Sequence, residues 1–289
     1  MFYRNLIIVL FFFAKVHAYQ SCTPHKNKIT LPSKEYDLNK PSIVKLNDAL
    51  VEISGISFYP KDSSVFAISD ENGYLYKIHL NKNILTERWK FDKKLDFEDV
   101  YLYDSTFYVL ASNGNIHELK FSPAGDTIFS RKNIFPGADK QKNEFESLCY
   151  DDERKKIIMI CKDCETDKKK SVTAWGFDPE TGKYTFSLFR IDVAPIAKKL
   201  GEDKIKFKPS AATINPVTHD IWILSSINQL LVVTDRDGVY KDVYTLNPGI
   251  FTQPEGITFT PWGDLIISNE AGDKYNAGTL LIFKPKKTG

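Results

Sequence analysis

From residue 51 onward, apolar residues occur in short runs rich in β-branched and aromatic side chains, and turn-forming residues separate the runs. Five runs align with one another, and a polar cluster follows each of them: 65–69, 107–111, 157–161, 221–225 and 265–268. Runs of this length and composition are typical of buried β-strands. A helical pattern of useful length is confined to residues 194–200. The pattern therefore predicts an all-β protein.

A short motif precedes each of these runs. Its five copies are EISGI (52–56), DFEDV (96–100), EFESL (144–148), KPSAA (208–212) and QPEGI (253–257). Successive copies start 44, 48, 64 and 45 residues apart, and three of these intervals are close to the ~40–45 residues of a four-stranded propeller blade. The longest interval contains an insertion, 192–207, which we expect to lie beside the motifs and to cover part of the channel mouth.

We therefore predict a single-domain β-propeller of five blades, each with about four antiparallel strands. The fifth repeat stops after its third strand, at 279–283, which would leave an open sheet edge. Residues 42–46 (SIVKL) are predicted to supply the missing outer strand, so that the N-terminus closes the ring. Six blades are the lesser alternative. A β-sandwich would explain the strands but not the five aligned motifs.

The first residues have the pattern of a targeting signal rather than that of a folded element. Arg4 precedes an apolar stretch at 6–14, which is too short to span a bilayer. We divide the chain into a signal peptide (1–18), a tether (19–41) and the propeller domain (42–289). Cleavage before Tyr19 would release the protein, whereas acylation of Cys22 would give it a lipid anchor. Either route predicts an exported protein of the periplasm or cell envelope, secreted or membrane-associated.

The net charge limits the kinds of partner that the protein is expected to bind, and the cysteines indicate its redox environment. The formal net charge is +2, with basic residues spread along the chain, so no nucleic-acid partner is expected. The protein is expected to be a monomer.

Cys161 and Cys164 have the spacing of a redox motif, but no βαβ pattern surrounds them. We expect a local disulfide, as suits an oxidising compartment, and a buried free thiol at Cys149.

The repeated motifs, together with NEFESL (143–148) and ISNE (267–270), resemble the SdiA-regulated, YjiK-like propeller family. The resemblance extends over residues 51–285 and implies a β-propeller of the cell envelope. It implies no reaction, because the family name describes how a member is regulated. The chemistry therefore depends on where the repeated polar residues fall.

Antiparallel pairing places the start of an inner strand beside the end of the second strand, so polar residues from both positions meet on one rim of the channel. Most of these residues are acids. The predicted metal ligands are Glu52, Glu98, Glu146, Glu255 and Glu270. The predicted ligand-binding residues are Asp70, Glu71, Lys162, Lys208, Ser210 and Asn269. Oxygen ligands of this kind suit calcium or magnesium rather than zinc or copper, and calcium is the expected cation.

Two functions follow from such a rim. In the first, it binds a divalent cation and a small polar ligand or an envelope partner. In the second, the protein is a calcium-dependent hydrolase, either a phytase-like phosphoesterase or a lactonase, and Glu146 or Glu255 activates water. The scarcity of rim cations weighs against a phosphate substrate, so binding is favoured and catalytic residues stay unassigned. A structural alternative also exists, in which each acid is satisfied within its own blade or by Lys162 and Lys208.

Overall fold

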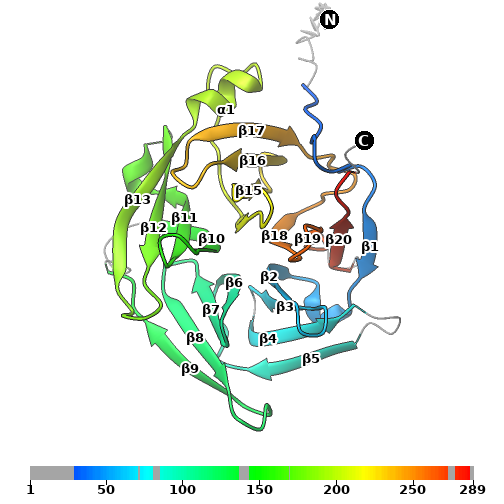
Figure 1. Cartoon of the computed structure of the whole chain (residues 1–289), viewed down its shortest axis with the longest axis vertical. Coiled ribbons are helices and arrows are strands. Elements are labelled where there is room, and N and C mark those ends of the chain that lie inside the picture. The colour runs from blue at the N-terminus through cyan, green and yellow to red at the C-terminus, as the bar shows by residue number, and fades with distance from the viewer. Residues whose placement is uncertain are drawn as a thin grey trace, which may run out of the picture.

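The computed structural model describes residues 29–70, 72–80, 85–136, 143–168, 170–272 and 277–286. Its strands form five four-stranded antiparallel sheets arranged around a common axis (Figure 1). The predicted five-bladed propeller is therefore confirmed. From the inner to the outer strand, the first two blades are β2 (Ile53–Tyr59), β3 (Ser64–Ser69), β4 (Asn72–His79) and β5 (Leu85–Lys90), then β6 (Phe97–Tyr103), β7 (Thr106–Ala111), β8 (Ile116–Phe121) and β9 (Ile128–Asn133).

The third and fourth blades repeat this order. Their strands are β10 (Asn143–Asp151), β11 (Lys156–Cys164), β12 (Ser171–Phe177) and β13 (Tyr184–Asp192), then β14 (Ala211–Ile214), β15 (Ile221–Ser225), β16 (Leu230–Thr234) and β17 (Tyr240–Thr245). Two short 3-10 helices, η1 (Asp48–Leu50) and η2 (Glu165–Asp167), and one α-helix, α1 (Ala194–Lys199), lie between strands. Among the described residues, no helix has the length and apolar character needed to cross a membrane.

The N-terminus completes the fifth blade. Its strands are β18 (Pro254–Phe259), β19 (Leu265–Asn269), β20 (Thr279–Phe283) and β1 (Ser42–Lys45). β1 runs antiparallel to β20, with Ser42 opposite Ile282 and Lys45 opposite Thr279 (Figure 1). The predicted closure by residues 42–46 is confirmed.

The core lies between neighbouring blades rather than in one central mass. For example, Phe66 of β3 contacts Phe107 of β7, with ring centroids 4.5 Å apart, and Trp222 of β15 meets Phe259 of β18 edge-on at 5.5 Å. All four rings are at least nine-tenths buried. Each inner strand also contacts the inner strand of the blade on either side. Packing between blades therefore holds the inner strands around the axis, where the repeated motifs lie.

Residues 29–41 form a packed strap, although the sequence pattern assigns them to a tether. Tyr36 and Leu38 are buried against the fourth and fifth blades. The Tyr36 hydroxyl donates to the Gly263 carbonyl at 2.7 Å. The strap is packed because Tyr36 and Leu38 join the hydrophobic core of the fourth and fifth blades. The predicted signal peptide and Cys22 lie outside the described residues.

The insertion at 192–207 contains the expected helix, but that helix does not cover the mouth. Ile196 of α1 and the preceding Val193 are buried in the same cluster as Val243 of β17, an outer strand. In Figure 1, α1 and β17 lie at the outer edge of the ring. The predicted lid is therefore wrong for α1, because its apolar side chains are buried at the outer edge. Only the end of the insertion, at Lys206, approaches the rim, where it pairs with Asp163.

Candidate functional site: an acidic rim

The rim is the end of the ring where inner strands begin and second strands end. The registers place Phe97 opposite Ala111, Asn143 opposite Cys164, and Pro254 opposite Asn269. Polar residues at both positions therefore lie at the same end of each blade, as antiparallel pairing predicts. Of the predicted ligand-binding residues, Glu71 lies outside the described residues.

Irregularities of strand pairing place three glutamates on the rim. The pairing of β6 with β7 skips Glu98, the pairing of β10 with β11 skips Glu146, and the pairing of β18 with β19 skips Glu255. An extra residue of this kind is a β-bulge, which bends the strand and redirects a side chain. The sequence motifs locate these glutamates, but they do not reveal the bulges.

Lys162 lies among the rim acids. It too is skipped by the strand pairing, between Cys161 and Asp163 of β11. Its ammonium group donates a hydrogen bond to the Glu146 carboxylate and lies 3.1 Å from Glu144 Oε1. The Glu146 side chain is only 8% exposed, so this pair is well shielded from water. Glu146 is therefore neutralised by its neighbour, as the structural alternative anticipates.

Glu98 is mostly protonated at neutral pH, and Glu255 titrates close to neutral pH. Burial raises the pKa of the Glu98 carboxyl to about 8, with a further contribution from Asp96, while Lys162 opposes the shift. Burial also raises the pKa of Glu255 to about 7, again against the influence of Lys162. Asp70 raises the pKa of both glutamates. These effects place the three acids and the one lysine within electrostatic reach of one another.

Glu52 and Glu270 form a pair of acids on the same rim. Burial raises the pKa of Glu270 to about 9, followed by its hydrogen bond with Glu52 and the charges of Glu52, Glu255 and Asp70. A hydrogen bond between two carboxyl groups requires a proton between them. Gln253 donates to Glu270 Oε2 at 2.5 Å. Glu270 therefore holds a proton near neutral pH.

Three of the predicted ligand-binding residues, Ser210, Asn269 and Lys208, make contacts with other parts of the protein. Ser210 donates to the Pro254 carbonyl at 2.9 Å and so joins the fourth blade to the fifth. Asn269 donates to the Ile250 carbonyl at 2.7 Å. Lys208 lies 3.0 Å from Asp163 and, with Lys206, lowers the pKa of that carboxyl. Their hydrogen bonds and ion pairs are therefore within the protein.

Asp99 is a buried acid that the sequence pattern did not single out. It is 2% exposed, and its two carboxyl oxygens accept hydrogen bonds from the backbone amides of Val100 at 2.8 Å and Leu148 at 2.7 Å. It therefore ties the inner strands β6 and β10 together. Burial raises its pKa well above the usual range. A signal was available, because small residues occupy this motif position in the other four copies, Gly55, Ser147, Ala211 and Gly256.

A compact metal cluster is not preformed among the described rim acids. In the described part of the chain, the group of three metal-ligating side chains whose donor atoms lie within 4.8 Å of one another is Cys161, Cys164 and Asp167. The two cysteines form the expected disulfide, and Asp167 accepts a hydrogen bond from the Thr173 amide at 3.1 Å. This group does not fit a metal ion. A cation at the rim would therefore draw two or more carboxylates closer. Cys149 is buried and free, as predicted.

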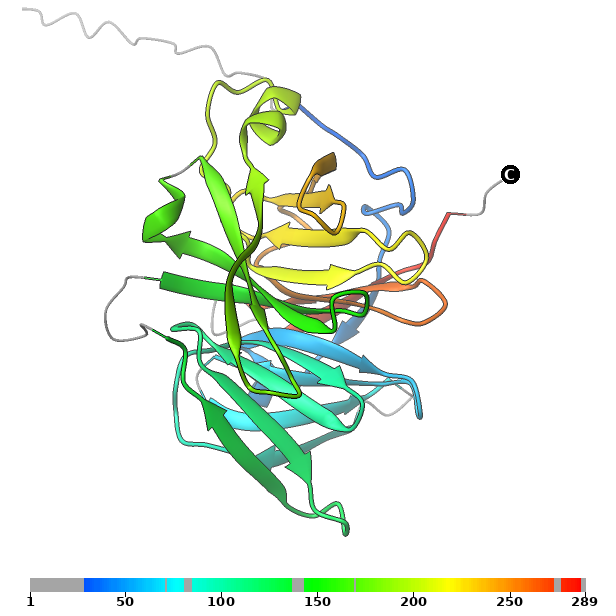
Figure 2. The same ribbon diagram turned by 60° about the vertical axis from the view of Figure 1, so that its left-hand side comes forward.

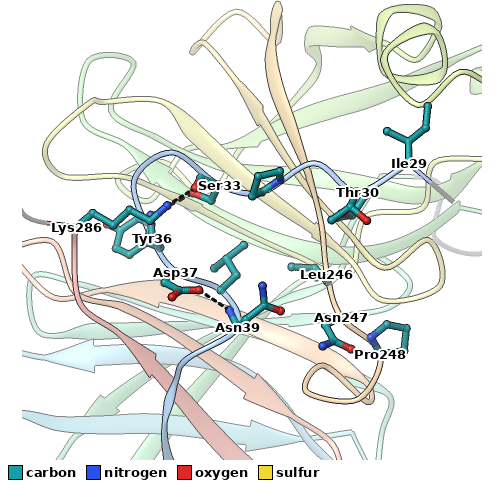
Figure 3. Close-up of a pocket in the computed structure, with 13 residues that line it drawn as sticks. Ile29, Thr30, Ser33, Tyr36, Asp37, Asn39, Leu246, Asn247, Pro248 and Lys286 are labelled. Atoms are coloured by element: carbon teal, nitrogen blue, oxygen red, sulfur yellow. Dashed lines mark hydrogen bonds between the residues drawn. The ribbon is translucent and has the colours of Figure 1, made fainter.

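A cavity of about 310 Å³ lies beside the strap rather than at the rim (Figure 3). Lys286 reaches across it to donate to the Ser33 carbonyl at 2.6 Å. Asp37 accepts from the Asn39 amide at 3.2 Å. Polar groups of this cavity are thus used to hold the strap, and we assign it no ligand.

Solved structures with similar architecture align with the chain at low sequence identity. Glutaminyl cyclase from Myxococcus xanthus has a TM-score of 0.57 and 14% identity, over 85% of this chain and 96% of that one. The calcium-binding protein regucalcin from Agrobacterium tumefaciens has a TM-score of 0.52 and 11% identity, over 85% and 96%. PQQ-bound aldose sugar dehydrogenase from Streptomyces coelicolor has a TM-score of 0.51 and 9% identity, over 86% and 99%. These likenesses show the fold alone.

No curated protein matches the sequence. The family model described as SdiA-regulated matches residues 26–275, which is most of the chain. This match agrees with the resemblance carried by the five motifs. The chain, a five-bladed β-propeller, belongs to the SdiA-regulated family.

Proposed function

We propose that the rim binds a divalent cation, calcium, and with it a small polar ligand or an envelope component. The observation that carries the proposal is the excess of acids over cations at one place. Glu98 and Glu255 lie within the influence of Lys162, which already pairs with Glu144 and Glu146. The Glu52–Glu270 pair is influenced instead by the acids Glu255 and Asp70. Carboxylate oxygens are the ligands that calcium prefers.

Proton release is the expected signature of such binding. The raised pKa values of Glu98, Glu255 and Glu270 mean that these groups hold protons near neutral pH. A divalent cation replaces those protons as it binds, since metal ligands must be deprotonated. Calcium affinity should therefore increase between pH 6 and pH 9, and calorimetry in buffers of different ionisation enthalpy should detect released protons.

Calcium titration of the purified protein tests the proposal. At a free calcium concentration of 100 times Kd, binding would stabilise the fold by ~2.7 kcal/mol. Glu255→Gln and Glu270→Gln should each weaken binding by about tenfold or more, equivalent to ~1.4 kcal/mol. Glu180→Gln is the matched control, because Glu180 is exposed in the turn between β12 and β13. A melting temperature that is indifferent to calcium and to chelator would contradict the proposal.

A lysine variant separates cation binding from a structural role of the acids. Lys162→Met removes the positive charge that competes for Glu144 and Glu146. If the rim binds calcium, this variant should bind it more tightly than the parent. If the acids only stabilise the blades, Lys162→Met should lower stability by the same amount with calcium and with chelator.

A calcium-dependent hydrolase is the second candidate, and one observation favours it. The pKa of Glu255, about 7, is near the optimum for a general acid or base at neutral pH. Phosphoesters and lactones should be assayed with calcium and with chelator. Hydrolysis that depends on calcium and is lost in Glu255→Gln would support the enzyme. Calcium binding without turnover of either class would support the binding function.

We also propose that the protein acts outside the cytoplasm. The disulfide between Cys161 and Cys164 supports this, because such bonds persist in oxidising compartments. The short apolar segment near the N-terminus supports export as well. Labelling cells with a radioactive fatty acid should mark the parent but not Cys22→Ala if Cys22 is acylated. Release of unlabelled protein would instead support cleavage before Tyr19.

A further inference from the structure

A lysine-rich surface surrounds α1, at a distance from the acidic rim. Four lysines line a cavity of about 600 Å³ between the insertion and the end of the third blade: Lys168, Lys170, Lys204 and Lys206. Two further lysines, Lys198 and Lys199, occupy the last turn of α1 and are exposed. We call the insertion at 192–206, with Lys168 and Lys170, the lysine face.

Positive charge predominates on the lysine face. Its six lysines outnumber its three acids, Asp192, Glu202 and Asp203. The Asp192 carboxylate accepts a hydrogen bond from the Ala194 amide at 2.9 Å, at the start of α1. One lysine, Lys206, is paired with Asp163 at 3.1 Å. The other five lysines are exposed around the cavity and the helix, and none of them forms an ion pair with a described carboxylate of the rim.

The floor of the cavity is apolar. Val193, Ala194, Ala197 and Ile205 contribute to its lining. Lysines around an apolar floor match a phospholipid, whose phosphate carries negative charge and whose glycerol and upper acyl carbons are apolar. A free inorganic anion would gain from the lysines but not from the apolar floor.

The chain enters the propeller beside the lysine face. A Cβ atom placed on Gly201, just after α1, would lie 2.9 Å from Ile29 Cδ1, so the first described residue adjoins the insertion. Figure 2 shows the start of the described chain next to α1. Cys22 precedes Ile29 by seven residues, which span at most ~25 Å when extended. An acyl group on Cys22 would hold this face close to a membrane.

We infer that the lysine face docks on a membrane surface that contains anionic phospholipid. Lysine ammonium groups contact the headgroup phosphates, and the apolar floor of the cavity receives the upper part of one lipid. The attraction is electrostatic and falls off within about one Debye length. Salt should therefore weaken it. The docking does not depend on calcium or on a ligand at the rim.

Vesicle sedimentation tests this surface. The experiment uses a shortened protein that begins at residue 23. This protein retains every described residue and lacks Cys22. We expect it to sediment with phosphatidylglycerol-containing vesicles, to stay in solution with pure phosphatidylcholine vesicles, and to be released by high salt. The quadruple variant Lys168→Gln, Lys170→Gln, Lys198→Gln and Lys204→Gln should bind the anionic vesicles at least about tenfold more weakly. Lys206 is left intact because it pairs with Asp163.

A matched variant removes the same charge elsewhere. It carries Gln at four exposed lysines of other surfaces, Lys120, Lys132, Lys155 and Lys183. This control should bind anionic vesicles like the parent, and both variants should melt like the parent. Equal losses in the two quadruple variants, or no binding by the parent, would overturn the inference. Release from vesicles by millimolar inorganic phosphate, at constant ionic strength, would also overturn it, because the site would then recognise a free anion.

Discussion

The chemistry of the rim depends on how the acidic side chains share the positive charge of Lys162. Lys162 pairs with Glu144 and Glu146, and it only partly offsets the effect of burial on the pKa values of Glu98 and Glu255. The acids on the rim are therefore not equivalent. Glu146 forms a satisfied ion pair, whereas Glu98, Glu255 and Glu270 hold protons that a cation would displace.

The raised pKa values predict a stability that falls as the pH rises. The folded-state pKa values of Glu98, Glu255 and Glu270, about 8, 7 and 9, lie above the ordinary glutamate value of 4.5. Each protonated group contributes stability at low pH that is lost as the pH rises through its folded pKa. Each unit by which the folded-state pKa exceeds the unfolded-state pKa contributes at most ~1.4 kcal/mol to the free energy of unfolding. His117 acts in the opposite sense below pH 6.5, because burial lowers its pKa to about 4.

Thermal denaturation between pH 6.5 and pH 9 therefore tests the rim acids, and the Gln variant identifies the contribution of one of them. Without divalent cations, the melting temperature should decline across this window. Glu98→Gln should flatten the decline, since Gln fills the same space without a charge. A slope that is identical in the parent and in Glu98→Gln would refute the assignment of that pKa.

At the scale of elements, neighbouring inner strands approach so closely that some positions exclude a side chain. A Cβ on Gly256 of β18 would lie 2.5 Å from the Ser54 carbonyl oxygen of β2. The same oxygen accepts a hydrogen bond from Ser268 at 2.8 Å, so it is held in place. A Cβ on Gly55 would lie 2.7 Å from the Val100 amide of the next blade. The glycines of these motifs therefore set the spacing between blades.

Gly256→Ala is expected to destabilise the protein by about 1–3 kcal/mol, the usual cost of overpacking. Chemical denaturation measures this change as a lower midpoint. Gly249→Ala is a suitable control, because that residue is exposed and the nearest atom to its added Cβ is a side-chain oxygen of Asn247 at 3.3 Å. Equal midpoints for the two variants would show that the blades separate freely at this junction.

The whole molecule is closed by segments from both ends of the chain. β1 pairs with β20, and the strap buries Tyr36 and Leu38 against the fourth and fifth blades. The Lys286 amide donates to the Glu35 carbonyl at 2.7 Å, which joins the C-terminal end to the strap. Closure therefore combines strand pairing with side-chain burial.

Two truncations separate these contributions. A chain that begins at residue 42 keeps β1 but loses the strap, and burial of two large side chains predicts a loss of ~3 kcal/mol or more. A chain that begins at residue 46 also exposes the edge of β20, which should cause association. Size-exclusion chromatography and thermal denaturation measure both effects. A stable monomer from the shorter chain would show that β1 is dispensable for closure.

The sequence by itself determined the blade count, the closure by 42–46, the disulfide and the identity of the acids near the rim. It could do so because strand alternation, turn residues and repeat spacing are local properties that recur along the chain. Only the tertiary structure decided how those acids differ. The bulges at Glu98 and Glu255, the pairing of Lys162 with Glu146, and the interstrand tie at Asp99 depend on contacts between strands. Sequence spacing carries no such information, because burial and the distance between charges arise when the blades pack around the axis.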